Sequence, residues 1–242
     1  MKLIIEKNED SVAQVAADII KKEILNNKKM NICFATGNSP LKTYNNLIKM
    51  YENKEISFKN ITSFNLDEYV GISKENPCSY HYFMHQNLFN KIDINPKNIN
   101  LPNGNGDIKK NGQEYEKLIV QKGGIDLMIL GIGVNGHIAF NEPGSKLESR
   151  TREIELTEST IEANKIYFKN KDEVPKTAIS MGLATILEAK KIILIATGQS
   201  KSQAIFNTIH GEITEKNPAS FLNKHNDVTL IIDEKAAKLL KN

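Results

Sequence analysis

The sequence predicts an α/β protein: one three-layer α/β/α domain with a largely parallel, Rossmann-like sheet. Three observations carry this prediction. Short, mostly apolar runs alternate with segments of helical periodicity, several of the runs contain few or no polar residues, and 242 residues suit one sizeable domain. Uninterrupted apolar runs are typical of strands covered by helices on both faces. No internal repeat, low-complexity segment or linker divides the chain, so residues 1–242 are expected to form a single domain.

Composition excludes several classes of function. The net charge is +3, and basic and acidic residues are interleaved without a dense basic block, so nucleic acid is not an expected partner. Cys33 and Cys78 form no CxxC pair, so neither a zinc site nor a disulfide framework is supported. No apolar run approaches the ~20 residues of a membrane span. The first residues lack the apolar core of a signal peptide, and a reducing, cytoplasmic location is expected.

The first elements are two strands with a long helix between them. The strands are expected at residues 3–5 and 31–35, because both stretches are apolar. Asp10 or Ser11 is expected to cap the helix, which runs to about residue 25 with apolar residues at helical spacing.

A turn with anion-binding character follows the second strand. It consists of Thr36, Gly37, Asn38 and Ser39, and Pro40 comes next. Ser39 suits the N-cap of the following helix, and Pro40 suits its first position. The free N–H groups and the dipole at such a helix start can bind phosphate. An ordinary strand–helix connection is equally compatible with this loop alone.

Two acidic residues, Asp67 and Glu68, come at the end of the third strand, expected at residues 61–66. Carboxylates at the end of a buried strand are candidates for a general base. Helix capping or simple solvation would account for the same two residues. A helix, a loop, a second helix and a central strand are then expected at residues 79–89, 98–107, 113–120 and 125–130.

The densest group of functional side chains follows the central strand. This loop, residues 131–143, carries Asn135, His137 and Glu142. Gly131 and Gly133 are expected to permit a positive φ or the close approach of a ligand. An ordinary turn with a satisfied histidine and a solvated glutamate is the alternative.

The last third of the chain begins with a polar stretch. Ser159 and Glu162 are expected to form a capping box for a short helix through residue 168, and residues 156–176 are expected to be a mobile lid. A core helix, a buried strand, a last strand and a short terminal helix follow; the first three are expected at residues 177–189, 191–196 and 228–232.

Lys201 lies at an unusual place for a cation. Ser200 and Gln203 are expected to form a capping box that puts Lys201 in the first turn of a helix. A cation there opposes the helix dipole, which makes sense if Lys201 meets a bound anion. A solvent-facing lysine is the alternative.

Four of these loops should meet at one edge of the sheet, because the carboxyl ends of parallel strands lie together there. They are residues 36–40, 67–69, 131–143 and 197–201. Such a site suits a small phosphorylated substrate that undergoes proton transfer. Asp67 could take a proton next to a carbonyl, and His137, oriented by Glu142, could move protons on a ring oxygen. No cofactor and no metal is required.

Several segments resemble the glucosamine-6-phosphate deaminase family, over nearly the whole chain. They read ATGNSP, FNLDEYVGISKENPCSYHYFMHQNLF, NINLPNGN, GIGVNGHIAFNEPGSKLESRTR and PASFLNKH. The resemblance implies the sugar-phosphate isomerase-like fold and the conversion of D-glucosamine 6-phosphate and water to D-fructose 6-phosphate and ammonia, without a cofactor.

The resemblance also implies roles for individual residues. Asp67 would move the C2 proton to C1, and His137 would open the sugar ring while Glu142 holds its imidazole. The turn Thr36–Ser39 and Lys201 would bind the phosphate. An imidazole suits proton exchange because it titrates near neutrality.

Three departures from the family pattern modify these expectations. Asn135 stands where many relatives have aspartate, so it can orient His137 but cannot supply charge. Ile166 stands where the family has a phosphate-binding arginine. Ile154 and Glu155 replace a Lys-Thr pair of the patch that binds N-acetylglucosamine 6-phosphate in activated relatives, so weak or absent allosteric activation is expected. The oligomeric state is left open, with a homo-oligomer as one option.

Three other functions compete with this one. A lactonase or isomerase of the same fold is favoured by Ile166. A catalytically silent sugar-phosphate sensor is disfavoured, because Asp67, His137 and Glu142 are all present. A dinucleotide-binding Rossmann protein would need a GxGxxG motif after the first strand, which the sequence lacks.

Overall fold

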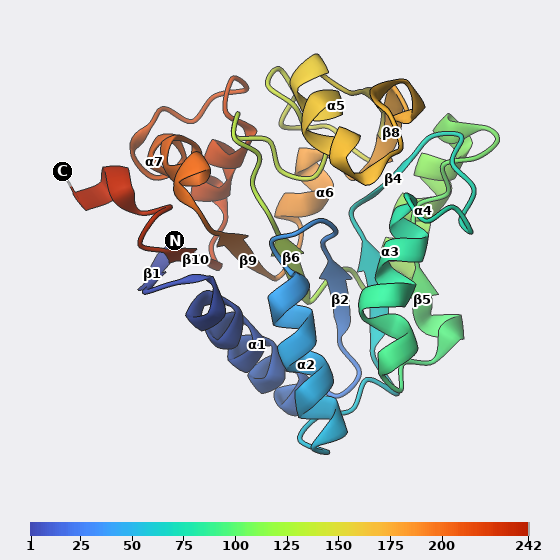
Figure 1. Ribbon diagram of the computed structural model, residues 1–242. Coiled ribbons are helices and arrows are strands. Elements are labelled where there is room, and N and C mark those ends of the chain that lie inside the picture. The colour runs from blue at the N-terminus through green and yellow to red at the C-terminus, as the bar shows by residue number, and fades with distance from the viewer. Residues whose placement is uncertain (242) are drawn as a thin grey trace.

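A seven-stranded parallel sheet forms the centre of the protein, as predicted (Figure 1). The structure is a computed structural model that describes residues 1–241. Each pair of neighbouring strands in this sheet is parallel. Along the sheet the strands are β1 (Lys2–Glu6), β10 (Val228–Asp233), β9 (Lys191–Ala196), β6 (Leu127–Leu130), β2 (Asn31–Phe34), β3 (Thr62–Asn65) and β5 (Ile99–Asn100).

The middle strands are buried on both faces because helices cover them. All residues of β2, β3 and β6 are buried, which explains the wholly apolar run of β6; β3 buries the polar residues Thr62, Ser63 and Asn65 as well. The helices α1 (Glu9–Asn26), α2 (Leu41–Glu52) and α3 (Tyr80–Asn87) cover the near face in Figure 1, and α4 (Ile108–Gln121) and α6 (Leu183–Leu187) lie behind. None of the helices in the described chain is long and apolar enough to cross a membrane.

A second, antiparallel sheet of three strands was not predicted. It consists of β4 (Asp67–Tyr69), β8 (Thr177–Ser180) and β7 (Arg152–Glu155). The helix predicted at residues 177–189 is wrong: its first part is β8, and only Leu183–Leu187 is helical. Gly182 marks the break, because a Cβ there would lie 2.0 Å from the carbonyl oxygen of Ser149.

Several predicted helix starts are also wrong by one to five residues. The side chains of Asn8 and Thr157 cap α1 and α5 (Glu158–Asn164) in place of the expected caps, and Asp107 caps α4, for which no cap was predicted. Each accepts hydrogen bonds from backbone N–H groups of the first turn, as a cap requires. Aspartate, asparagine, serine and threonine all cap well, so a polar stretch offers several starts and the incoming chain direction selects one.

Two helices begin without the side-chain caps predicted for them. Pro40 precedes α2, and the Ser39 side chain does not cap it. Lys201 ends a 3₁₀ turn (Gln199–Lys201) and precedes α7 (Ser202–His210), so the predicted capping box with Ser200 is absent. The short terminal helix is a 3₁₀ turn, Lys238–Lys241. The two uncapped starts leave backbone N–H groups for another acceptor.

Candidate active site

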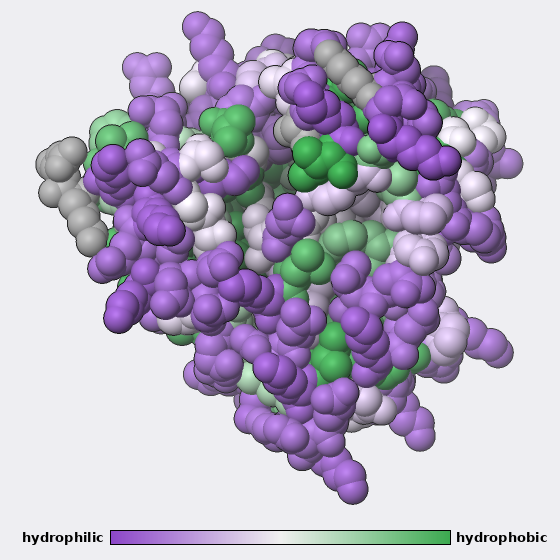
Figure 2. Space-filling view, in the orientation of Figure 1, coloured by the Kyte–Doolittle hydropathy of each residue, from purple (hydrophilic) through white to green (hydrophobic). Residues whose placement is uncertain are grey.

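A cavity of about 470 Å³ lies at the carboxyl edge of the central sheet. The four loops expected there line it, because they follow β2, β3, β6 and β9, which are neighbours in the order β9-β6-β2-β3. In Figure 2 this face is hollowed below the segment that contains α5, and paler and green residues lie within a mostly hydrophilic surface. Strand order thus concentrates the candidate groups of distant sequence segments in one cavity.

Asp67 lies at the start of β4 and lines the cavity, although only 5% of its surface is exposed. Burial first, and then the charge of Glu68, raise the pKa of Asp67 to about 8. A carboxylate with so high a pKa is a stronger base than an ordinary aspartate and is still partly ionised near neutrality. This geometry suits Asp67 to take a proton from carbon.

The raised pKa predicts a stability that falls as the pH rises. An aspartate in the unfolded chain has a pKa of about 3.9. Between that value and about pH 8 the folded protein holds a proton at Asp67 that the unfolded chain releases, so folding is favoured less as pH increases. Asp67→Asn removes this pH-dependent loss of folding stability. We expect the variant to gain stability over wild type on the order of a few kcal/mol more at about pH 8 than at about pH 5.

Urea unfolding of both proteins at the two pH values measures this difference. An equal difference at both values would mean that Asp67 titrates as it does in the unfolded chain.

His137 lies beside Glu142 in the loop after β6. Its Nδ1 is 3.4 Å from Oε2 of Glu142, a contact that becomes an ion pair only when the imidazole is protonated, and Nδ1 has no hydrogen-bond partner. Asn135 holds the same carboxylate oxygen: its Nδ2 donates to Oε2 at 2.7 Å. Its Oδ1 accepts from the backbone N–H of His137 at 3.2 Å. Asn135 therefore orients Glu142 and the backbone of His137, and does not bond the imidazole.

Glu142 is buried and ionised. Burial alone raises its pKa, but the neighbouring His137 and hydrogen bonds from Thr160 and Asn135 outweigh it and lower the pKa to about 2. Thr160 donates its hydroxyl proton to Oε1 of Glu142. The carboxylate thus stays charged across the neutral range and can stabilise a protonated imidazole.

The glycines of the loop 131–143 have roles that differ from the predicted ones. The positive φ values are at Gly136 (84°) and Ala139 (50°), not at Gly131 or Gly133. A Cβ at Gly133 would lie 2.3 Å from the imidazole of His137, so Gly133 makes room for that ring. Ala139 lines the cavity in a conformation that non-glycine residues rarely adopt.

The other end of the cavity is suited to an anion. The residues Thr36, Gly37, Asn38 and Ser39 line it at the uncapped start of α2. Lys201 lines it at the uncapped start of α7, and burial lowers its pKa. In the described part of the chain no carboxylate lies within ion-pair distance of Lys201, so its charge is uncompensated. Two helix starts and an unpaired ammonium together attract a phosphate.

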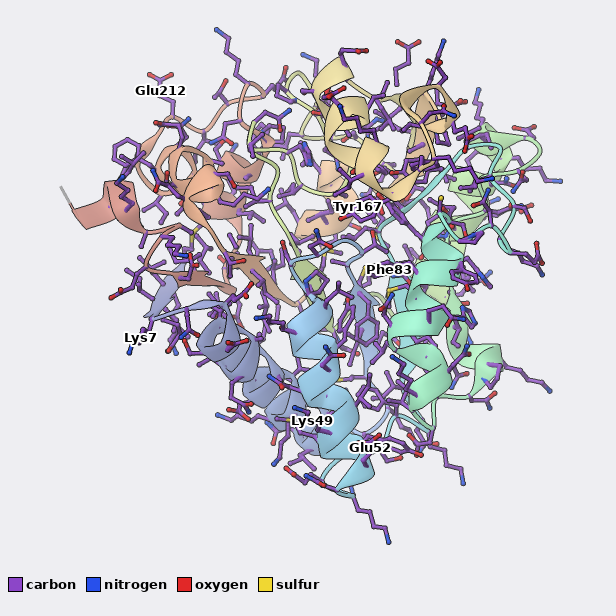
Figure 3. All side chains as sticks on the ribbon, viewed as in Figure 1. Lys7, Lys49, Glu52, Phe83, Tyr167 and Glu212 are labelled. Carbon is purple, nitrogen blue, oxygen red and sulfur yellow. The ribbon has the colours of Figure 1, made fainter. Side chains whose placement is uncertain are left out.

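Residues of the segment 156–176 line one side of the cavity. Phe83 of α3 and Tyr167 of the 3₁₀ turn Lys165–Tyr167 both line it and are labelled in Figure 3. Sγ of Cys78 donates to the carbonyl oxygen of Tyr167 at 3.0 Å. Ile166 also lines the cavity and is 68% exposed. This segment touches both the cavity and the carboxylate of Glu142, through Thr160.

Known proteins that are similar to this chain act on sugar phosphates, as their names state. A family described as glucosamine-6-phosphate isomerases/6-phosphogluconolactonase matches residues 6–231. The chain belongs to this family. A glucosamine-6-phosphate deaminase of Mycoplasma mycoides subsp. mycoides SC is 52% identical over 242 residues, which are 100% of this chain and 98% of the relative. One of Thermoanaerobacter sp. (strain X514) is 50% identical over 241 residues, 99% of this chain and 95% of the relative.

A solved structure confirms the fold of this member of the glucosamine-6-phosphate isomerase family. It is a monomeric glucosamine-6-phosphate deaminase, 42% identical, with a TM-score of 0.97 over 99% of this chain and 100% of that one. The parallel sheet and the sugar-phosphate isomerase-like architecture inferred from the sequence are therefore correct.

One residue of this site, Thr160, was not predicted from the sequence. The expected capping box at Ser159 and Glu162 concealed it. Because Thr157 is the actual cap, Thr160 falls at the position where its hydroxyl turns inward to Glu142. The spacing of Thr157 and Thr160, three residues apart before a helical segment, was the sequence signal for a helix that begins at Thr157. Within the described residues, no group of three or more His, Cys, Asp or Glu side chains is arranged to hold a metal ion.

Proposed function

We propose that this protein is a glucosamine-6-phosphate deaminase, which converts D-glucosamine 6-phosphate and water to D-fructose 6-phosphate and ammonia. The observation that carries the proposal is the content of one cavity. A buried base, Asp67, and the imidazole of His137 share it with the uncompensated ammonium of Lys201, and Glu142 contacts the imidazole without lining the cavity itself. The relatives that are 50% and 52% identical over essentially the whole chain bear this enzyme's name.

The reaction divides into three steps that these residues can serve. His137 passes the proton of the C1 hydroxyl to the ring oxygen, which opens the ring; Glu142 stabilises the imidazolium formed in between. Asp67 then removes the proton from C2 and returns it to C1. The ammonium group loses one proton and O1 gains one, so the C1 aldehyde becomes a hydroxyl and a C2=N bond forms. Water adds to C2, and the nitrogen leaves as ammonia. The turn Thr36–Ser39 and Lys201 hold the phosphate and so fix C1 and C2 beside Asp67.

The segment 156–176 acts as a lid in this proposal. Its contacts at Tyr167 and Thr160 couple its position to the cavity mouth and to Glu142. Closing the lid would exclude bulk water during proton transfer and would complete the contacts of Glu142.

The first test is ammonia release from glucosamine 6-phosphate, with and without N-acetylglucosamine 6-phosphate. We expect release that the second compound does not change, because Ile154 and Glu155 replace basic-polar residues of the effector patch. Release only with the effector would contradict this expectation. A lactonase would instead hydrolyse 6-phosphogluconolactone and release no ammonia, and a sensor would bind the sugar phosphate without turnover.

Ile166→Arg is expected to tighten binding of the substrate. Ile166 lines the cavity and is exposed, so a guanidinium there can reach the phosphate from the lid side. A charge-assisted hydrogen bond of about 1.5–3 kcal/mol would lower KM by roughly tenfold or more. Steady-state kinetics measures the effect, and Ile213→Arg, another exposed isoleucine, is the control. An unchanged KM would show that the side chain at this position points away from the phosphate.

A further inference from the structure

Glu68 follows the proposed base directly in β4 but faces the other way. Successive side chains of a strand point to opposite faces, so Asp67 lines the substrate cavity and Glu68 lines a second cavity of about 310 Å³ behind it. Glu68 is only 5% exposed. It is absent from the lining of the substrate cavity, so it is not placed to touch a substrate.

Three backbone N–H groups hold the carboxylate of Glu68. Oε1 accepts from Tyr69 at 2.9 Å and from Tyr80 at 2.9 Å, and Oε2 accepts from His81 at 2.8 Å. Tyr80 and His81 are the first residues of α3, so the carboxylate binds the start of a helix. Burial raises the pKa of Glu68, and the three N–H donors oppose that rise by stabilising its charged form.

No cation in the described part of the chain forms an ion pair with Glu68. Lys74, His81 and His85 line the cavity on its side. Lys74 is largely exposed, and its Nζ is 3.8 Å from a carboxylate oxygen of Glu75. Burial and the neighbouring His85 lower the pKa of His81, which therefore carries little charge near neutrality. No ion pair therefore offsets the negative charge of Glu68, and this charge acts on the neighbouring Asp67.

Within the described residues, no lysine or arginine forms an ion pair with Asp67 that would cancel this effect. Besides Glu68 and His137, the titratable groups that interact with it are the thiol of Cys33 in β2 and the phenols of Tyr69, Tyr80 and Tyr115, all of which have raised pKa values and are neutral. Two carboxyl groups on adjacent residues of one buried strand therefore repel each other, and the one with fewer donors takes the proton more readily.

We propose that Glu68 is a positioning residue for the proposed base. Its hydrogen bonds to Tyr69, Tyr80 and His81 hold β4 against the start of α3, and so orient Asp67 toward the cavity. Its charge makes Asp67 a stronger base. The proposal rests on the proposed function only in giving Asp67 the role of base; the electrostatic coupling of the two residues holds for any reaction in this cavity.

NMR titration of the Asp67 carboxyl carbon tests the coupling without turnover. Its resonance is identified by its absence in Asp67→Asn. In wild type we expect a midpoint near pH 8. Glu68→Gln keeps the size of the side chain and removes its charge, so the midpoint should fall by about one pH unit or more. Asp107→Asn is the control, because it also neutralises a carboxylate that caps a helix, α4, at another place; it should leave the midpoint unchanged.

The same variants separate charge from structure in catalysis. In Glu68→Gln the acid limb of kcat/KM for ammonia release should shift downward with the midpoint, with little change in KM. A midpoint that does not move, or that moves equally in Asp107→Asn, would overturn the proposal. Wild type that titrates as expected but releases no ammonia would refute the proposed function alone.

A second variant covers the case in which Glu68→Gln does not fold. His81→Lys leaves the backbone N–H that binds Glu68 in place and adds a positive charge in the cavity that Glu68 lines. The added charge should lower the Asp67 midpoint in the same direction. An unchanged or raised midpoint in this variant would also overturn the proposal.

Discussion

Asp67→Asn is expected to lower kcat for ammonia release by about 10²- to 10⁴-fold, the range of a lost general base. An amide of the same shape cannot accept the C2 proton, because it lacks a basic oxygen near neutral pH. The proposed phosphate-binding residues, Thr36–Ser39 and Lys201, lie on other loops of the cavity, so substrate binding should be largely intact. Steady-state kinetics with direct binding of glucosamine 6-phosphate, measured by calorimetry, separates the two quantities.

A matched control for this variant is Asp18→Asn. Asp18 lies on the exposed side of α1, where it accepts a hydrogen bond from Gln14. This change should leave both kcat and binding at the wild-type level. If Asp67→Asn lost substrate binding but kept the rate of proton transfer, Asp67 would be a binding residue and the base would lie elsewhere.

Lys201→Ala is expected to raise KM for glucosamine 6-phosphate by roughly tenfold to a hundredfold, with a smaller effect on kcat. Removing a charged donor from a phosphate costs about 1.5–3 kcal/mol. The loss should be large here because no other lysine and no arginine lines the described part of this cavity. By the family resemblance, Ile166 stands where relatives have a phosphate-binding arginine, so no guanidinium compensates for the lost ammonium.

Two controls isolate the phosphate contribution. Lys49→Ala removes a lysine at the far end of α2, well away from the cavity in Figure 3, and should leave KM unchanged. Glucosamine without phosphate should inhibit wild type and Lys201→Ala equally weakly. An unaltered KM in Lys201→Ala would mean that the two helix starts alone hold the phosphate.

Local pattern identified most regular elements of the central sheet. The mostly apolar runs at β2, β6 and β9 could be assigned from their own composition, because strands buried on both faces admit few polar residues. Helix starts were less accurate, since neighbouring polar residues cap equally well. The short strands β4, β7 and β8 were missed because each is three or four residues long and pairs only across large sequence separations.

The sequence by itself determined the fold class, the family and the four loops that carry functional groups, because these depend on residue types within a few positions of one another. The tertiary structure decided how those groups meet. The strand order β9-β6-β2-β3 makes the loops neighbours, and packing brings Thr160 to Glu142 and the ring of His137 against Gly133. Burial and the charge of Glu68 raise the pKa of Asp67. Contacts and desolvation arise only when distant segments pack together, and no local pattern encodes them.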